Sequence, residues 1–551
     1  MRKVSRVAGA SLCGNLSGVS KKCAFANEIF TRCVLKSGTV DVPRPAVTLA
    51  PRHATVRVAL LILFCLAVTA WARPLMLPDE GRYVGVAWEM LRSHDWLTPT
   101  LDGLPYFHKP PLFYWITASS LSLFGMNEFA ARAAPILGSL LGALSLWLLA
   151  RRHGGQQRAD MALVALLAQP LFLLGGQFAN LDSLVAGCIT ATVALLAHAA
   201  LCMEQALPHR RALWAAYAMA AIGVLAKGLI GFVIPGLIIS VWLLLWGRWR
   251  LLLRLLSLPG LLIFLAVAGP WFVLMQQRFP DFLYYFFVVQ HFKRFAASGF
   301  NNVEPFWFYP MVLLGASVFW WPWLRRVFAR GYLGDATERP LRLLMLCWLA
   351  LPVLFFSLPQ SKLLGYVLPA VPPLAWLAAD GWAQARASTR RPWWISAALG
   401  TALSLAVVIG LAVKPPHGER ELARALAAHL QAGQPVVMLE QYYFDLPFYA
   451  HLIEPSAIVD GWDDPALTGK DTWRKEVFDA GSFAPERART LLIKPADLPA
   501  LLCRSPVSWV IGSPAAVLRF PQLAQSSVLL SQRGVELMAV DRRNLACSSP
   551  G

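Results

Sequence analysis

The chain has 551 residues, of which 57% are hydrophobic and only 15% are charged. This composition is typical of polytopic membrane proteins and excludes an ordinary soluble enzyme. The formal net charge of +19 does not indicate nucleic-acid binding, because the lysines and arginines fall in short clusters between apolar runs. Such clusters are typical of loops that stay on the cytoplasmic side of a membrane.

The first 57 residues are basic and weakly patterned, and they lack the long apolar stretch of a cleavable signal peptide. We expect a disordered cytoplasmic leader here, with a translation start downstream of Met1 as the alternative. We see no internal repeat in the sequence.

Residues 58–413 contain eleven apolar segments that suit membrane-crossing helices. The segments are Val58–Trp71, Ala131–Ala150, Asp160–Leu174, Ser183–Met203, Ala212–Leu225, Leu229–Trp246, Leu258–Met275, Phe306–Leu324, Leu341–Phe356, Leu363–Ala379 and Trp393–Val413. Because several are short, the expected number is eleven to thirteen, the larger figure applying if loops hide further helices.

Every second loop between these segments is rich in arginine. The basic loops contain Arg151, Arg152 and Arg158, then Arg210 and Arg211, then Arg248, Arg250 and Arg254, then Arg325, Arg326, Arg330, Arg339 and Arg342, then Arg386, Arg390 and Arg391. This bias predicts that the basic loops are cytoplasmic. The loop at residues 74–130 then faces outward, and an odd number of spans puts the C-terminus on the same side.

The composition changes after residue 413. Pro415, Pro416 and Gly418 indicate a linker, and a helical pattern follows over Arg420–Leu430. Strand-like runs begin at Val436, Ser508 and Val535, so residues 414–551 predict a small α/β domain. Cys503 and Cys547 fall in this domain and could form a disulfide if it lies outside the cytoplasm; a bonded and a free pair are equally compatible with the sequence. Cys65, Cys188, Cys202 and Cys347 lie in apolar runs and are expected to be inert.

The outward loop concentrates charge in the stretch PDEGRYVGVAWEMLRSHDWLTPTLDGLPYFHKPP at Pro78–Pro111. Within it, Val84, Ala87, Trp88 and Leu91 follow helical spacing and predict an amphipathic helix at the membrane interface. Leu112–Phe124 is too short for a span and suits a second interfacial helix. Anchoring of the loop to the membrane is the simpler interpretation, and it is compatible with a functional role.

Carboxylates stand at two outward-facing positions. Asp79 and Glu80 follow Pro78, where a carboxylate can act as a general base or orient a sugar, although acidic residues are also favoured at any helix start. Asp182 follows Asn180 at the outer end of another segment and could be either functional or a helix cap.

Cations and aromatic residues share the same predicted face. Lys109 suits a phosphate, and the prolines after it fix the direction of the backbone, while His108 could bind a metal or simply lie at the wet interface. Lys362 and Tyr366 have the spacing to reach one ligand, with snorkelling as the alternative for the lysine. Lys227 could be structural or could reach the same cavity, and the later-loop residues His291, Lys293 and Arg294 could bind phosphate or contribute to anchoring.

Several stretches resemble a known family. These are PDEGRYVGVAWEML, DWLTPTLDGLPYFHKPPLFYW, NEFAARAAP, AKGLIGFVIP and SKLLGYVLP. They are similar to the bacterial aminoarabinose transferases that modify lipid A, relatives of the protein O-mannosyltransferases with the GT-C fold. The resemblance covers roughly residues 58–413 and the layout of a periplasmic C-terminal domain. It implies a polytopic inner-membrane enzyme whose catalytic loop, residues 74–130, lies in the periplasm, and it associates the chain with lipopolysaccharide modification and polymyxin resistance.

The resemblance also implies roles for individual residues. Asp79 matches the catalytic aspartate and Asp182 the second functional aspartate, with Glu80 beside the first. Substrate-binding positions are implied at Arg82, Tyr83, Lys109, Arg294 and Tyr366, of which Lys109, Arg294 and Tyr366 match groups that hold the donor phosphate; Lys227 is a weaker candidate. Lys362 is a further predicted substrate-binding residue, because its spacing from Tyr366 would let both side chains reach one ligand.

Family members can bind zinc through a Glu just before the lysine and a His in the later periplasmic loop. This chain has His108 at the first position and His291 as the nearest candidate for the second. Zinc is therefore an open cofactor question, since two ligands do not make a closed tetrahedral site. We expect no nucleotide cofactor.

The sequence thus predicts transfer of a sugar, expected to be 4-amino-4-deoxy-L-arabinose, from undecaprenyl phosphate to lipid A phosphate. Membrane lipids are the other expected partners, and nucleic acid is not. The alternatives within the class are a hexosamine transferase acting on lipid A and a protein O-mannosyltransferase-like enzyme. A transporter is disfavoured, because transporters place ionisable residues near the bilayer midplane and show inverted repeats. A scaffold that merely anchors the C-terminal domain would leave the charged outer loops unexplained.

Overall fold

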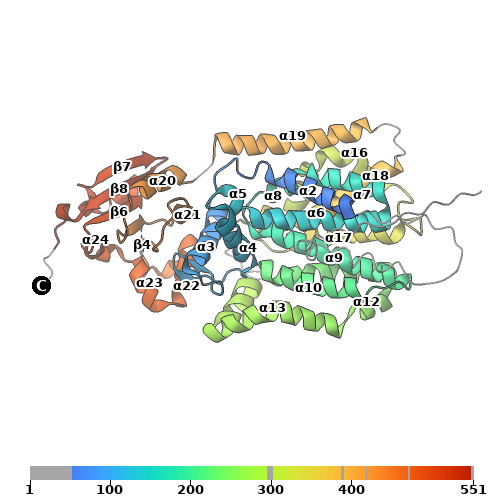
Figure 1. Cartoon of the computed structure of the whole chain (residues 1–551), viewed down its shortest axis with the longest axis horizontal. Coiled ribbons are helices and arrows are strands. Elements are labelled where there is room, and N and C mark those ends of the chain that lie inside the picture. The colour runs from blue at the N-terminus through green and yellow to red at the C-terminus, as the bar shows by residue number, and fades with distance from the viewer. Residues whose placement is uncertain (1–51, 294–301, 386–389, 416–417, 470–471, 548–551) are drawn as a thin grey trace, which may run out of the picture.

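The computed structural model describes residues 52–293, 302–385, 390–415, 418–469 and 472–547, and the side chains of residues 291–293 are not described. A bundle of long helices forms one part of the molecule, and a sheet flanked by helices forms the other (Figure 1). Of the predicted leader, only residues 52–57 are described, and they belong to the first helix. The rest of the leader and Arg294 lie outside the described residues.

All eleven predicted segments are helical. The bundle contains α2 (Arg52–Ala67), α6 (Ala133–Gly154), α7 (Gln156–Leu167), α8 (Pro170–Gly175), α9 (Leu181–Glu204), α10 (Arg210–Lys227), α11 (Ile230–Leu245), α12 (Trp249–Leu255), α13 (Leu258–Arg278), η2 (Tyr284–Lys293), α15 (Phe308–Ala316), η3 (Val318–Trp320), α16 (Trp321–Leu324), η4 (Arg325–Phe328), α17 (Arg339–Ser357), η5 (Leu364–Ala370), α18 (Val371–Gln384) and α19 (Arg391–Val413). Among the described residues, α6, α9, α13, α17 and α19 are long and apolar enough to cross a membrane.

Three predicted segments are broken, and prolines explain the breaks. The segment at 160–174 divides into α7 and α8 because Gln169, which precedes Pro170, adopts an extended conformation. The segment at 306–324 becomes α15, η3 and α16, with Pro322 at the start of the last helix. The segment at 363–379 opens as the 3₁₀ helix η5, which contains Pro369, before α18 begins.

Helix α9 is the centre of the bundle. Of its most apolar 18-residue stretch 89% is buried, compared with 22% for α19, which runs along the edge of the bundle (Figure 1). Small residues allow this close packing: α6 and α9 touch at Gly138 and Gly187, where a β-carbon on Gly187 would overlap the Gly138 backbone. A central helix is therefore fixed in position by its neighbours, which matters because its first turn contains Asp182.

Ion pairs connect predicted basic loops to one another at one end of the bundle. Arg158 pairs with Glu338 and lies 3.4 Å from Asp380, which Arg342 approaches to 3.0 Å. In another predicted basic loop, Arg248, which follows α11, pairs with Glu204, the last residue of α9, at 2.7 Å. These contacts agree with the alternation of basic loops in the sequence.

The predicted charged loop occupies the opposite end, between the bundle and the sheet (Figure 1). It contains α3 (Asp79–Ser93), the hairpin β1 (Thr100–Leu101) and β2 (Leu104–Pro105), α4 (Leu112–Phe124) and α5 (Glu128–Ala131). Both helices predicted for this loop are present. Val84 and Ala87 of the predicted stripe are fully buried, so the stripe packs into the protein. We refer to this end as the sheet end of the bundle.

The C-terminal part is an α/β domain, as the sequence predicts. Its elements are α20 (Arg420–His429), β3 (Val436–Leu439), α21 (Leu446–Tyr449), β4 (Ala457–Val459), η6 (Pro465–Thr468), α22 (Trp473–Ser482), α23 (Pro485–Leu491), β5 (Leu492–Ile493), η7 (Pro495–Asp497), α24 (Leu498–Leu502), β6 (Val507–Gly512), α25 (Pro514–Val517), η8 (Pro521–Leu523), β7 (Ser527–Gln532), β8 (Val535–Asp541) and η9 (Arg542–Asn544). The strand order is β5-β4-β3-β6-β8-β7, with the first four strands parallel and the last two antiparallel to their neighbours.

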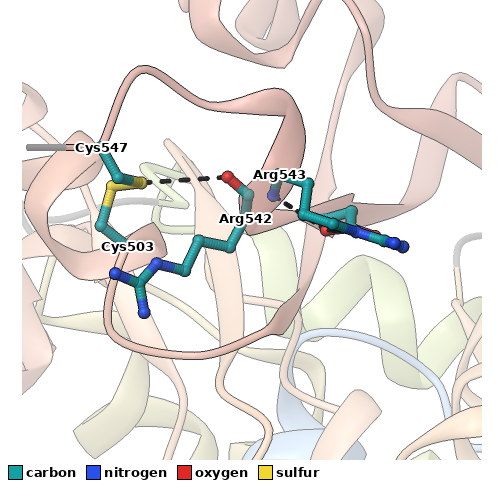
Figure 2. The surroundings of a disulfide bond; sticks show 5 residues. Cys503, Arg542, Arg543 and Cys547 are labelled. Atoms are coloured by element: carbon teal, nitrogen blue, oxygen red, sulfur yellow. Dashed lines mark hydrogen bonds and ion pairs between the residues drawn. A yellow bond between two sulfur atoms is a disulfide. The ribbon is translucent and has the colours of Figure 1, made fainter. Parts of the chain in front are cut away.

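A disulfide joins Cys503 to Cys547 and ties the end of the described chain to α24 (Figure 2). Their Cα atoms lie 5.8 Å apart, and 44 residues of sequence separate them. Cys65, Cys188, Cys202 and Cys347 are free. The sequence was compatible with a bonded or a free pair, and the structure contains the bonded pair.

Loss of this disulfide is expected to destabilise the C-terminal domain by about 4 kcal/mol, the loop-closure entropy for its sequence separation. Thermal unfolding of the full chain in detergent, with and without dithiothreitol, measures the effect. The double variant Cys503→Ser/Cys547→Ser provides the control, since its unfolding temperature is expected to be low and insensitive to the reductant. An unfolding temperature of the wild type that dithiothreitol leaves unchanged would contradict the expectation.

Candidate active site

Asp79 and Asp182 line one cavity of about 430 Å³ at the sheet end of the bundle. The polar part of its wall also includes Arg73, Gln177 and Asn180. The remaining wall is mostly apolar and comes from α8, η5 and α19. Its residues include Pro170, Leu171, Leu174, Leu363, Leu364, Leu368, Val407, Val408 and Leu411. The cavity therefore joins two carboxylates to a surface suited to a hydrocarbon chain.

Asp79 is the first residue of α3, where the helix dipole favours a negative charge. Its side chain is 26% exposed, and Asn180 donates a 3.4 Å hydrogen bond to its Oδ2 atom. The Nη1 atom of Arg82, one turn along the helix, lies 3.6 Å from Oδ1. The carboxylate is thus oriented by two neighbours and remains open to the cavity.

Asp182 lies in the first turn of α9, and it does not cap the helix. The cap is Asn180, whose side chain accepts a 3.0 Å hydrogen bond from the Asp182 backbone N–H. The Asp182 carboxylate instead forms an ion pair with Lys227, which ends α10. Gly365 packs so closely against this carboxylate that a β-carbon there would overlap it. The position of Asp182 is therefore set by its surroundings.

Lys227 and Tyr366 meet beside Asp182. The Lys227 ammonium group lies 4.3 Å from the centroid of the Tyr366 ring, a cation–π distance. The structure therefore brings together five of the predicted site residues in two neighbouring groups: Asp79 with Arg82, and Asp182 with Lys227 and Tyr366.

Glu80 lies behind the cavity and is fully buried. Arg73 binds it at 2.5 Å and Arg132 at 2.9 and 3.0 Å, and the backbone N–H groups of Met76 and Ala179 donate to it at 2.8 and 2.7 Å. Burial disfavours its charge, but the attraction of Arg132 and Arg73 is stronger and lowers its pKa to about 2. Glu80 is not among the residues lining the cavity. This placement does not support the prediction that Glu80 is catalytic.

The same network holds the two segments that lead into the aspartates. Arg132 donates to the carbonyl oxygens of Ala70, Arg73 and Pro74 at 2.5 to 2.9 Å, all of them before α3. Arg73 donates at 2.8 Å to the carbonyl oxygen of Gln177, shortly before α9. The network therefore fixes the start of α3 and the approach to α9 relative to each other.

Sequence reasoning did not single out Arg73, Arg132 or Glu476. The arginine in NEFAARAAP was a signal for Arg132, because a charge among small apolar residues needs a buried partner. Arg73 between α2 and α3 offered a weaker form of the same signal. Glu476 belongs to α22, far along the sequence, and nothing in its local sequence points to the site.

Lys362 is engaged by the protein backbone. Its ammonium group donates to the carbonyl oxygens of Pro359 at 2.6 Å and Glu304 at 2.7 Å, and the residue is 4% exposed. This arrangement fastens the segment before α15 to the segment before η5. Tyr366 faces Lys227, so the placement does not support the expectation that Lys362 and Tyr366 reach one ligand.

Tyr83 and Lys109, like Arg82, Lys227 and Tyr366, are not among the residues that line the cavity. Tyr83 is buried and packs edge-on against Phe113, with 5.9 Å between ring centroids. Burial raises the pKa of Tyr83 well above its usual value, so its hydroxyl stays protonated. Lys109 is half-buried at the start of the connection to α4. Their predicted contacts with substrate remain predictions.

His108 is 5% exposed and forms a 2.8 Å hydrogen bond between its Nε2 atom and the hydroxyl group of Tyr285 in η2. This ring nitrogen is therefore already engaged. His291 belongs to the same helix, but its side chain lies outside the described residues. Among the side chains that are described, no three His, Cys, Asp or Glu groups come together as metal ligands. Because the side chain of His291 is not described, the zinc question stays open, and we assign no chemical step to a metal.

A second cavity of about 960 Å³ lies between α10, α11 and α13. Its wall is almost entirely apolar and includes Leu229, Phe232, Leu261, Phe264 and Phe272. Leu229 follows Lys227 by two residues, so this cavity begins close to the Asp182–Lys227 pair.

Comparison with known proteins agrees with this architecture. A family model described as dolichyl-phosphate-mannose-protein mannosyltransferase matches residues 108–273. The crystal structure of ArnT from Cupriavidus metallidurans bound to undecaprenyl phosphate superimposes with a TM-score of 0.75 at 25% identity, over 91% of this chain and 99% of that one. The fold and the site together define a membrane-spanning, multi-pass protein of the GT-C glycosyltransferase class.

Curated relatives give the family. An undecaprenyl phosphate-alpha-4-amino-4-deoxy-L-arabinose arabinosyl transferase from Aeromonas hydrophila is 33% identical over 396 residues, which are 68% of this chain and 70% of the relative. The chain belongs to this family of arabinosyl transferases. A transferase of the same name from Sodalis glossinidius is 34% identical over 342 residues, 62% of this chain, and the match spans only 61% of that relative's length.

Proposed function

We propose that the chain transfers 4-amino-4-deoxy-L-arabinose from undecaprenyl phosphate to a phosphate group of lipid A. The observation that carries the proposal is the cavity in which Asp79 and Asp182 meet an apolar wall. Such a cavity suits a substrate with a polar sugar phosphate and a hydrocarbon chain. The names of the relatives supply the donor, and the resemblance of the sequence motifs supplies the acceptor.

In the proposed reaction, an anionic oxygen of the acceptor phosphate forms a bond to C1 of the sugar. The bond between C1 and the oxygen of undecaprenyl phosphate breaks, and its electron pair leaves with the phosphate. Positive charge then builds on the sugar ring, where the carboxylates of Asp79 and Asp182 stabilise it. Because a phosphate acceptor is already an anion, the step needs no general base; a hydroxyl acceptor would need one, and Asp79 would be the candidate.

The departing phosphate gains negative charge, which nearby cations stabilise. Lys227 is held between the Asp182 carboxylate and the Tyr366 ring, a geometry that supports a role in orienting this phosphate. We assign Lys109 and Arg294 to the same phosphate from the family resemblance alone. Glu80 is assigned a positioning role, because its ion pairs connect the segments that precede the two aspartates.

We further propose that the protein lies in the bacterial inner membrane, with the active site and the C-terminal domain in the periplasm. Two observations support this orientation. The basic loops are joined by ion pairs at the opposite end of the bundle, as expected for the cytoplasmic side. The C-terminal domain contains the Cys503–Cys547 disulfide, a bond that persists in oxidising compartments.

Mass spectrometry of lipid A tests the proposal in cells. Lipid A from cells that express the chain should contain phosphate groups substituted with aminoarabinose, and lipid A from the deletion strain should lack them. Cells that express the Asp79→Asn variant provide the matched control, with the protein level checked by immunoblot. An identical set of lipid A species with and without the gene would contradict the proposed acceptor, whereas a different added sugar would contradict the proposed donor.

A further inference from the structure

The C-terminal domain places the carboxylate of Glu476 beside Arg82, whose guanidinium group also lies near Asp79. Glu476 lies in α22, where it is 7% exposed, and its Oε2 atom is 3.1 Å from the Nε atom of Arg82. The Nη1 atom of the same guanidinium group is 3.6 Å from Oδ1 of Asp79. Arg82 therefore stands between one carboxylate from the membrane part and one from the C-terminal domain.

Arg82 is held in this position from several sides. Phe444, also in the C-terminal domain, stacks on its guanidinium group at 4.9 Å. Burial disfavours the charge of Arg82, but Glu476, Tyr106, Tyr83 and Asp79 together outweigh this effect and raise the pKa of the guanidinium group above its usual value. A buried guanidinium group with two acidic neighbours shares its charge between them.

The docking of the domain leaves little freedom for this arrangement to shift. A β-carbon on Gly81 would come within 2.9 Å of the Asp445 backbone nitrogen. Farther along α3, Arg92 donates to the carbonyl oxygen of Leu452 at 2.9 Å. Because α3 begins with Asp79, contacts along this helix transmit the position of the domain to the active site.

We propose that Glu476 is a positioning residue for the transfer reaction: it holds Arg82 away from a full ion pair with Asp79 and keeps the Asp79 carboxylate directed into the cavity. The C-terminal domain thereby completes the active site. This inference rests on the proposed function, since the reaction at Asp79 is the readout. Glu476 acts through Arg82 and does not line the cavity.

The variant Glu476→Gln tests the inference in the purified full chain. Its kcat for sugar transfer is expected to fall about 10- to 100-fold, the typical cost of misplacing a catalytic group, while KM for the undecaprenyl-linked donor changes by less than about twofold. Glu476→Asp is expected to recover part of kcat. Glu486→Gln is the matched control, because Glu486 is an exposed carboxylate of α23, in the same domain, and pairs only with the exposed Arg489 among the described contacts.

A double-mutant cycle with Arg82→Gln separates positioning from a general effect on folding. If Glu476 acts through Arg82, Glu476→Gln should lower kcat no further in the Arg82→Gln background, whereas independent effects would multiply. Multiplying effects, or a wild-type kcat in the single variant, would overturn the inference. An inactive wild type would instead overturn the proposed function, so the two failures are distinguishable.

Discussion

Asp79→Asn is expected to lower kcat for sugar transfer by roughly 10³-fold, the scale seen when a group that stabilises transition-state charge is removed. Asparagine has the same shape and can keep a hydrogen bond with Asn180, but it carries no charge to stabilise the sugar cation. The side chain is partly exposed at a helix start, so its replacement should leave the fold intact.

Steady-state kinetics with purified variants measure the Asp79 effect, and thermal unfolding checks the fold. Asp463→Asn provides the control, because Asp463 is an exposed aspartate of the C-terminal domain that pairs with Lys494 at 2.8 Å. We expect this control to keep the wild-type kcat. An Asp79→Asn variant with more than a tenth of the wild-type kcat would remove Asp79 from the mechanism.

Glu80→Gln is expected to lower the free energy of unfolding by about 3 to 5 kcal/mol, because it leaves two buried guanidinium groups without their carboxylate. Both guanidinium groups are almost completely buried, with Arg132 at 0% and Arg73 at 5% exposure. Denaturation in detergent, compared with the exposed-site variant Glu486→Gln, measures the loss. Equal stability of these two variants would contradict the structural role of the network.

The same carboxylate predicts a dependence of stability on pH. The pKa of Glu80 falls from 4.5 to about 2 on folding, so its ion pairs stabilise the protein fully above pH 4.5. That contribution, about 3 kcal/mol, is lost as the pH falls through the folded pKa. The unfolding temperature of the wild type should therefore fall more between pH 5 and pH 3 than that of Glu80→Gln. Parallel pH profiles for the two proteins would be inconsistent with the depressed pKa.

Helical geometry explains why the adjacent residues Asp79 and Glu80 differ in placement. Consecutive residues of an α-helix point about 100° apart, so adjacent side chains can face different surroundings. Asp79 reaches the cavity and Glu80 turns into the protein toward Arg132. The sequence pattern predicts a catalytic role for both carboxylates, and the structure places only Asp79 in the lining of the cavity.

Local patterns were sufficient for most of the helices. Apolar runs are enough to locate all eleven helical segments. The breaks within them depend on prolines such as Pro170, which disfavours a helical conformation at the preceding residue. In the C-terminal domain, β3, β6 and β8 were recognised from their apolar runs. The strands β4 and β5 span only three and two residues, too few for an alternating pattern to appear.

Contacts between distant parts of the chain could not be predicted in the same way. The pairing of Arg82 with Glu476 depends on how the C-terminal domain packs on α3, which no local pattern encodes. The Asp182–Lys227 pair likewise depends on the packing of α9 against α10. Family motifs identified Asp182, Lys227 and Arg82 as individual residues, while their partners emerged only from the fold.

Transfer by the purified full chain in detergent is the most direct test of the central claim. The reaction contains undecaprenyl phosphate-linked aminoarabinose and lipid A, and mass spectrometry follows both lipids. We predict that lipid A gains one aminoarabinose for each undecaprenyl phosphate released, and that Asp79→Asn slows the formation of both products by roughly 10³-fold. Absence of both products, under conditions in which ArnT from Cupriavidus metallidurans forms them, would contradict the account.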